Sequence, residues 1–144
     1  MNTHVRDNLK AIGDPWASYT PAWTATTTNP TIGNGTITGA WMSVGKLVHF
    51  RAKIVFGSTT TAGSGAYLFS LPATMSGGYG TNASIGVGST FDTSAPALQV
   101  WNVRRSSSTT VVLTQTTGTN VTNSGPFTWA TGDEIELSGT YEAA

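Results

Sequence analysis

The segment Lys46–Phe56 reads KLVHFRAKIVF, and its alternation predicts the strand around which the rest of the chain is organised. Apolar residues lie on one side of an extended chain: Val48, Phe50, Ala52, Ile54 and Phe56. The other side carries His49, Arg51 and Lys53. A period of two is typical of a strand with one face on a core and the other toward water. We therefore expect a central, half-buried antiparallel strand bounded by Gly45 and Gly57.

The composition indicates one uncharged, β-rich domain. The 144 residues fit a single domain, and only 10% of them are charged against about 25% in typical proteins. Seven basic and seven acidic side chains cancel, so we expect no attraction to nucleic acid. Aromatic residues supply the apolar surface for a core, while the abundant Thr, Ser, Asn and Gly suit strands and turns.

Several classes of site are disfavoured by the residue types. The chain has no cysteine and only two histidines, His4 and His49, far apart in the sequence. We therefore expect no disulfide, no metal site and no cofactor. No apolar run approaches the roughly 20 residues of a membrane span, so we expect no membrane insertion. The first ten residues also lack the apolar core of a secretory signal.

The first fifteen residues are predicted to be a helix and linker, separate from a β domain over residues 16–144. Asn2 to Ile12 fits a short helix that ends before Gly13 and Asp14-Pro15. Val5, Leu9 and Ile12 form one apolar stripe on it. Eleven residues are too few to remain helical alone. The stripe therefore either docks on its own domain or packs against other subunits or a larger assembly, as an oligomerisation or attachment element.

The Pro- and Trp-rich residues 14–34 are predicted to lie over the core. Prolines here exclude a helix and place any strand at a sheet edge. Residues 36–44 then read as a strand that forms a hairpin with the central one. Four further strands follow, over residues 66–71, 82–91, 98–104 and 109–115, and a last one ends the unit 127–142. In residues 82–91, Ala83, Ile85, Val87 and Phe91 are expected inward, and Ser84, Gly86, Gly88 and Thr90 outward.

About eight strands with short loops predict an all-β fold, namely an antiparallel β-sandwich or jelly roll. A propeller would need a repeat of about 40 residues, and the sequence shows none. The order of the strands cannot be read from the sequence.

No pattern in the chain favours catalysis. A Ser-His-Asp arrangement would need His49 beside a serine and an orienting Asp92 or Asp133, and nothing in the spacing favours it. Glu134 and Glu136 share a strand face, as a glycosidase pair would, but a solvated outer face on a late strand explains them better. We predict that the protein is not an enzyme.

Aromatic side chains among hydroxyls and amides suggest sugar binding. The candidate ligand contacts are Trp101 and Trp129, with Gln99 and Asn102 close in the sequence. The alternative is that each tryptophan belongs to the core or to a subunit interface.

Two parts of the chain resemble known proteins. The start, NTHVRDNLKAIGDPW, resembles a segment of tail-associated structural proteins of phages, carried here by Asn2, Val5, Arg6, Asp7, Asn8 and Leu9. The body, from YTPAWT through the strand pair around VGKLV to SGTYE, is similar to phage fibre-tip and virion-surface domains. Such domains are commonly trimeric β-sandwiches that bind a host surface or decorate the particle.

The resemblance implies a homotrimeric virion protein, made in the bacterial host cytoplasm, with other virion proteins as partners. Its loops 57–65, 76–81 and 116–125 would face a host cell-surface glycan. A tail-fibre or receptor-binding role is the first reading. Capsid decoration and a monomeric carbohydrate-binding module are the alternatives.

Overall fold

The computed structural model describes residues 3, 5–6, 10, 13 and 15–144. Nine strands follow one another along this part of the chain: β1 (Ala17–Tyr19), β2 (Trp23–Ala25), β3 (Thr36–Val44), β4 (Leu47–Val55), β5 (Tyr67–Ser70), β6 (Ser84–Asp92), β7 (Ala97–Arg105), β8 (Thr110–Thr114) and β9 (Glu134–Glu142). The fold is all-β, which confirms the predicted class.

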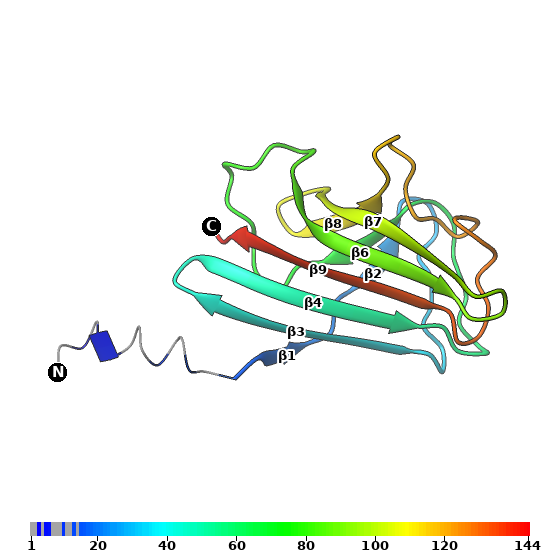
Figure 1. Ribbon diagram of the computed structural model, residues 1–144, viewed down its shortest axis with the longest axis horizontal. Helices are drawn as coiled ribbons and strands as arrows, with labels where there is room; N and C mark the ends of the chain where they lie inside the picture. Colours follow the sequence, from blue (N-terminus) through cyan, green and yellow to red (C-terminus); the bar gives the residue numbers. More distant parts are fainter. Residues whose placement is uncertain (1–2, 4, 7–9, 11–12, 14) are drawn as a thin grey trace.

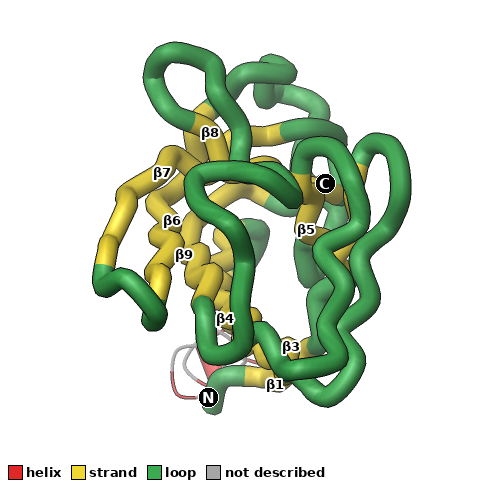
Figure 2. The backbone as a smooth tube through the Cα atoms, turned by 90° about the vertical axis from the view of Figure 1, so that its right-hand side faces the viewer, coloured by secondary structure: helices red, strands yellow, loops and turns green. Residues whose placement is uncertain are grey.

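All nine strands form one antiparallel sheet in the order β1-β3-β4-β9-β6-β7-β8-β5-β2. The sheet curls, so that β5 faces β4 and β9 across the interior (Figures 1 and 2). We predicted about eight strands in a two-layered sandwich. That arrangement is not confirmed, because strand pairing runs without a break from β4 through β9, β6, β7 and β8 to β5.

The extra strands come from the Pro-rich segment. β1 pairs only with β3, and β2 pairs only with β5, so both lie at the ends of the sheet. Pro21 lies between them and lacks the N–H that a central strand needs. The predicted edge position is confirmed, and so is the predicted hairpin, because β3 and β4 pair over their full lengths.

Strand β4 has the predicted alternation. Its inward side chains are all buried, as is Phe56, which follows the strand: Val48, Phe50, Ala52, Ile54 and Phe56. On the opposite face, His49 and Arg51 are exposed. In β9, Ile135, Leu137 and Tyr141 are buried in the same way. Burial of each large apolar side chain contributes about 1.5–3 kcal/mol, so this face of β4 and β9 anchors the core.

Aromatic rings close the inside of the curled sheet. Trp23 meets Phe56 and Tyr67 edge to face, with ring centroids 5.2 and 5.0 Å apart. Phe56 also stacks on Trp129 at 4.7 Å with an interplanar angle of 7°. These contacts link the two ends of the sheet, since Trp23 and Tyr67 belong to β2 and β5 while Phe56 follows β4.

The predicted facing of β6 is wrong beyond Ile85. A β-bulge between Ser84 and Gly86 shifts the pairing with β7, and an extra residue in one strand exchanges its faces. Val87, expected inward, is 56% exposed, whereas Thr90, expected outward, is fully buried. The small residues therefore face the interior, where Gly86 lies so close to β9 that an added Cβ would be 1.9 Å from the Ser138 carbonyl oxygen.

The predicted N-terminal helix falls largely outside the described residues. Leu9 and Ile12 are not among them, and Val5 is described and 50% exposed. The predicted apolar stripe of Val5, Leu9 and Ile12 therefore stays a prediction.

Candidate functional site

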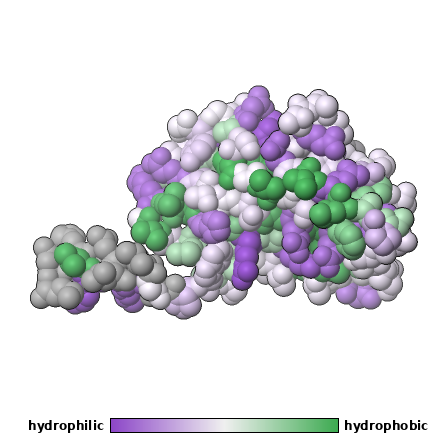
Figure 3. Space-filling model, in the orientation of Figure 1, coloured by the Kyte–Doolittle hydropathy of each residue, from purple (hydrophilic) through white to green (hydrophobic). Residues whose placement is uncertain are grey.

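An exposed surface lies on the outer face of the sheet, across β3, β4, β9, β6 and β7. The pairing register places the outward side chains in rows. One row runs from Thr38 through Lys53, Glu136 and Ser89 to Val100. Because neighbouring strands are about 4.8 Å apart, side chains in one row are direct neighbours. We call this surface the outer face; Figure 3 shows it with hydrophilic residues on some parts and hydrophobic residues on others.

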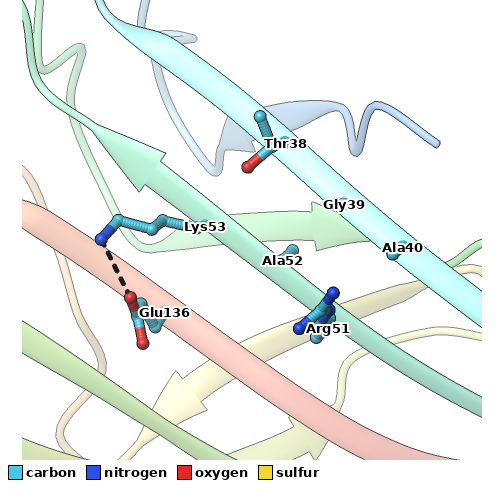
Figure 4. Close-up of a pocket in the computed structure, with 7 residues that line it drawn as sticks. All are labelled: Thr38, Gly39, Ala40, Arg51, Ala52, Lys53 and Glu136. Carbon is cyan, nitrogen blue, oxygen red and sulfur yellow. Dashed lines mark ion pairs between the residues drawn. The ribbon is translucent and has the colours of Figure 1, made fainter. Parts of the chain in front are cut away.

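A hollow of about 380 Å³ lies on the outer face over β3, β4 and β9. It is lined by Thr38, Gly39, Ala40, Arg51, Ala52, Lys53 and Glu136 (Figure 4). The cause is side-chain size. β3 contributes only small residues here, while the neighbouring β4 contributes the long side chains of Arg51 and Lys53. The volume falls in the range of small-ligand sites, which is about 300–1,000 Å³.

Lys53 is held at one end of the hollow by two carboxylates. Its Nζ lies 2.7 Å from Glu134 Oε2 and 3.1 Å from Glu136 Oε1. The pKa of Lys53 is raised, chiefly by the hydrogen bond to Glu134; partial burial opposes the rise, and Glu136 adds to it. Lys53 is therefore charged at neutral pH, and the two carboxylates share its ammonium group.

Arg51 is held at the other end by an aromatic ring. Its guanidinium carbon lies 5.2 Å from the centroid of the Trp16 ring, within the range of a cation–π contact. Trp16 also meets His49 edge to face at 5.1 Å. The His49 Nδ1 is 2.7 Å from Thr140 Oγ1, which fixes the imidazole from the β9 side.

An apolar stripe lies on the outer face over β6 and β7. Its members are Val87, Leu98 and Val100, which are 56%, 65% and 64% exposed. Val100 is directly opposite Ser89, and Leu98 is opposite Phe91. The stripe appears as green atoms across the middle of the molecule in Figure 3. The sequence predicts Val87 on the inner side, and the bulge in β6 reverses this direction; no facing was predicted for Leu98 and Val100.

The four residues predicted to contact a ligand do not form one site. Trp101 is 2% exposed, and its Nε1 donates to Thr90 Oγ1 at 3.0 Å inside the core. Trp129 is half-buried against Phe56 and donates to the Thr122 carbonyl at 2.7 Å. The structure thus places Trp101 in the core, which was the alternative to sugar binding in the sequence analysis. Gln99 and Asn102 are half-buried on opposite faces of β7.

The residues considered for catalysis have other neighbours. The hydroxyl bonded to His49 is that of Thr140. Asp92 accepts bonds from Ser94 and Ala95, and Asp133 accepts from Thr93 and Ala130. Both aspartates thus hold turns. Glu134 and Glu136 share a face, as predicted, and both bind Lys53.

The loop 57–65 is held along its length by segment 26–34. Thr59 N donates to Asn34 Oδ1 at 2.9 Å, and the backbones of Thr61 and Thr31 bond in both directions. Further along, the Ser64 amide donates to the Thr28 carbonyl at 2.9 Å. This small polar loop is therefore hydrogen-bonded to the neighbouring segment.

Comparisons of the chain with protein families, with curated proteins and with solved structures found no match in any of the three. Among the described residues, no three His, Asp or Glu side chains are grouped as metal ligands. No helix in this part of the chain is long and apolar enough to cross a membrane.

Proposed function

We propose that this chain is a non-enzymatic structural protein on the surface of a phage particle, of the tail-fibre or receptor-binding type. In this proposal it acts as a homotrimer, bound to other virion proteins through residues 1–15 and their apolar side chains Val5, Leu9 and Ile12. The curled sheet would then be a variant of the β-sandwich or jelly roll that such proteins commonly have.

The observation that carries the proposal is the apolar stripe of Val87, Leu98 and Val100. Contiguous exposed apolar surface typically marks a protein–protein interface. Val87 lies on β6, which pairs with both β7 and β9, and Leu98 and Val100 are paired with β6, so strand pairing holds the backbone of the stripe in place for a partner. A second subunit would remove these side chains from water, and closed symmetry would repeat the contact in each copy. The trimeric state and the location on a phage particle are taken from the resemblance to phage surface domains.

A second candidate, a monomeric carbohydrate-binding module, is favoured by one observation. The hollow beside Arg51 and Trp16 combines an aromatic ring, charged groups and hydroxyls, which are the groups that hold sugars. Capsid decoration remains the alternative location on the particle, because the stripe would serve a subunit contact in either place.

The native mass of the chain tests the proposal. Sedimentation equilibrium is measured on the full chain and on a chain that begins at Trp16. We expect the full chain to be a trimer, and the shortened chain to be a trimer of the same or lower affinity, since the stripe remains in both. Monomers of both chains over the micromolar range would contradict the proposal and favour the carbohydrate-binding module.

A further inference from the structure

Arg51 is a cation of the outer face that is available to a ligand at the hollow. Lys53 is bonded to Glu134 and Glu136, whereas Arg51 pairs with no carboxylate within the described residues. Its direct neighbours in the register are Ala40 on β3 and Ser138 on β9, which are both uncharged. The guanidinium therefore retains its capacity for a bidentate bond to an anionic group.

The guanidinium is also held in place before a ligand arrives. The Trp16 ring packs against it at 5.2 Å, and His49 supports the same ring from the side. His49 is in turn fixed by Thr140 at 2.7 Å. A long side chain that is already ordered loses less conformational entropy on binding. Trp16 and His49 act here as positioning residues for Arg51.

The two ends of the hollow differ in chemistry. Arg51 supplies hydrogen-bond donors at one end, and Glu136 supplies carboxylate acceptors at the other, while Thr38 lies on β3, across Lys53 from Glu136 (Figure 4). Glu136 binds Lys53 through Oε1, and its Oε2 can accept a hydrogen bond from a hydroxyl of a ligand. A ligand that fits both ends carries an anionic group together with hydroxyls on one small frame.

We infer that the hollow binds an acidic sugar, with its carboxylate on Arg51 and its hydroxyls on Glu136 and Thr38. The inference rests on the proposed function in one respect, since a sugar polymer of the host surface is the expected source of the ligand. It moves the sugar-binding surface from the predicted Trp101 and Trp129 to strands β3, β4 and β9.

Calorimetric titration with a short oligosaccharide of galacturonic acid tests the inference, and the neutral oligosaccharide of galactose is the matched ligand. The variant is Arg51→Gln. The matched control is Arg104→Gln, which removes the same charge from β7, where the guanidinium bonds to Asn82 instead. We expect saturable binding of the acidic sugar to the unaltered chain. The affinity should fall about tenfold or more in Arg51→Gln and change less than twofold in Arg104→Gln, because a bidentate charged bond is lost only in the first.

Three results would overturn the inference: no binding of the acidic sugar, equal binding of the neutral sugar, or equal losses in the two variants. A glycerol phosphate polymer is titrated in parallel. If this polymer binds to the unaltered chain and not to Arg51→Gln, while the acidic sugar does not bind, the inference of a carboxylated ligand is wrong. The native mass is measured on the same samples, so a binding failure in an intact trimer contradicts the site alone, while a monomer that binds contradicts the proposed function alone.

Discussion

At the scale of single residues, the buried bond between Trp101 and Thr90 decides which face of β7 is the core. The indole Nε1 is 3.0 Å from Thr90 Oγ1, and Thr90 is fully buried. A buried indole N–H that lacks an acceptor costs free energy, so this pair fixes β6 against β7 in one register. The bond also explains why a tryptophan that could stack on a sugar is here a core residue.

Replacement of this hydroxyl gives a prediction at the same scale. Thr90→Val keeps the shape but leaves Nε1 without an acceptor, so the free energy of unfolding should fall by about 1–3 kcal/mol. Urea unfolding followed by circular dichroism at fixed protein concentration measures it. In a Trp101→Phe background the donor is absent, and the same replacement should cost clearly less. An equal cost in both backgrounds would show that the bond has no role in stability.

At the scale of elements, the alternation in the sequence predicts strands better than it predicts their faces. It is sufficient for β4 and β9, where pairing is regular over nine residues. It fails in β6, because the bulge after Ser84 depends on the close approach of Gly86 to β9. Contacts of this kind are between strands distant in the sequence, and no local pattern reports them.

The candidate site was accessible to sequence reasoning only in part. The polar face of Lys46–Phe56 predicts that Arg51 and Lys53 point outward together, and this is confirmed. The approach of Trp16 to Arg51 could not be predicted, because it requires the pairing of β1 with β3. The part of the apolar stripe formed by Val87 could not be predicted, because the outward direction of Val87 follows from the bulge.

The close approach at the bulge gives a prediction at the scale of the element. Gly86→Ala would place a Cβ 1.9 Å from the Ser138 carbonyl oxygen and 2.6 Å from the Gly139 Cα. Both are backbone atoms, so the strands must separate, and we expect a loss of about 3 kcal/mol or more, or failure to fold. Gly77→Ala is the matched control, because nothing lies within 4 Å of its added Cβ. We expect a change within about 0.5 kcal/mol there. Equal stability of the two variants in thermal unfolding would contradict the described register.

At the scale of the whole molecule, the curled sheet has two faces of different character. The inner face holds the aromatic core, and the outer face carries the hollow over β3, β4 and β9 beside the apolar stripe over β6 and β7. The proposed ligand site and the proposed subunit contact would thus use separate strands of one face. This arrangement agrees with a surface protein that assembles through one part of the face and binds a ligand through the other.

The measurement that tests this account most directly is the native mass of Val100→Lys by sedimentation equilibrium. The control is Val44→Lys, which alters an exposed valine at the end of β3, away from the stripe; the two valines are 64% and 40% exposed. Burial of a lysine charge in an apolar contact is costly, so Val100→Lys should be monomeric with an unchanged circular dichroism spectrum. The unaltered chain and Val44→Lys should remain trimers. A trimer of Val100→Lys, or a monomer of the unaltered chain, would contradict the claim that the stripe joins the subunits.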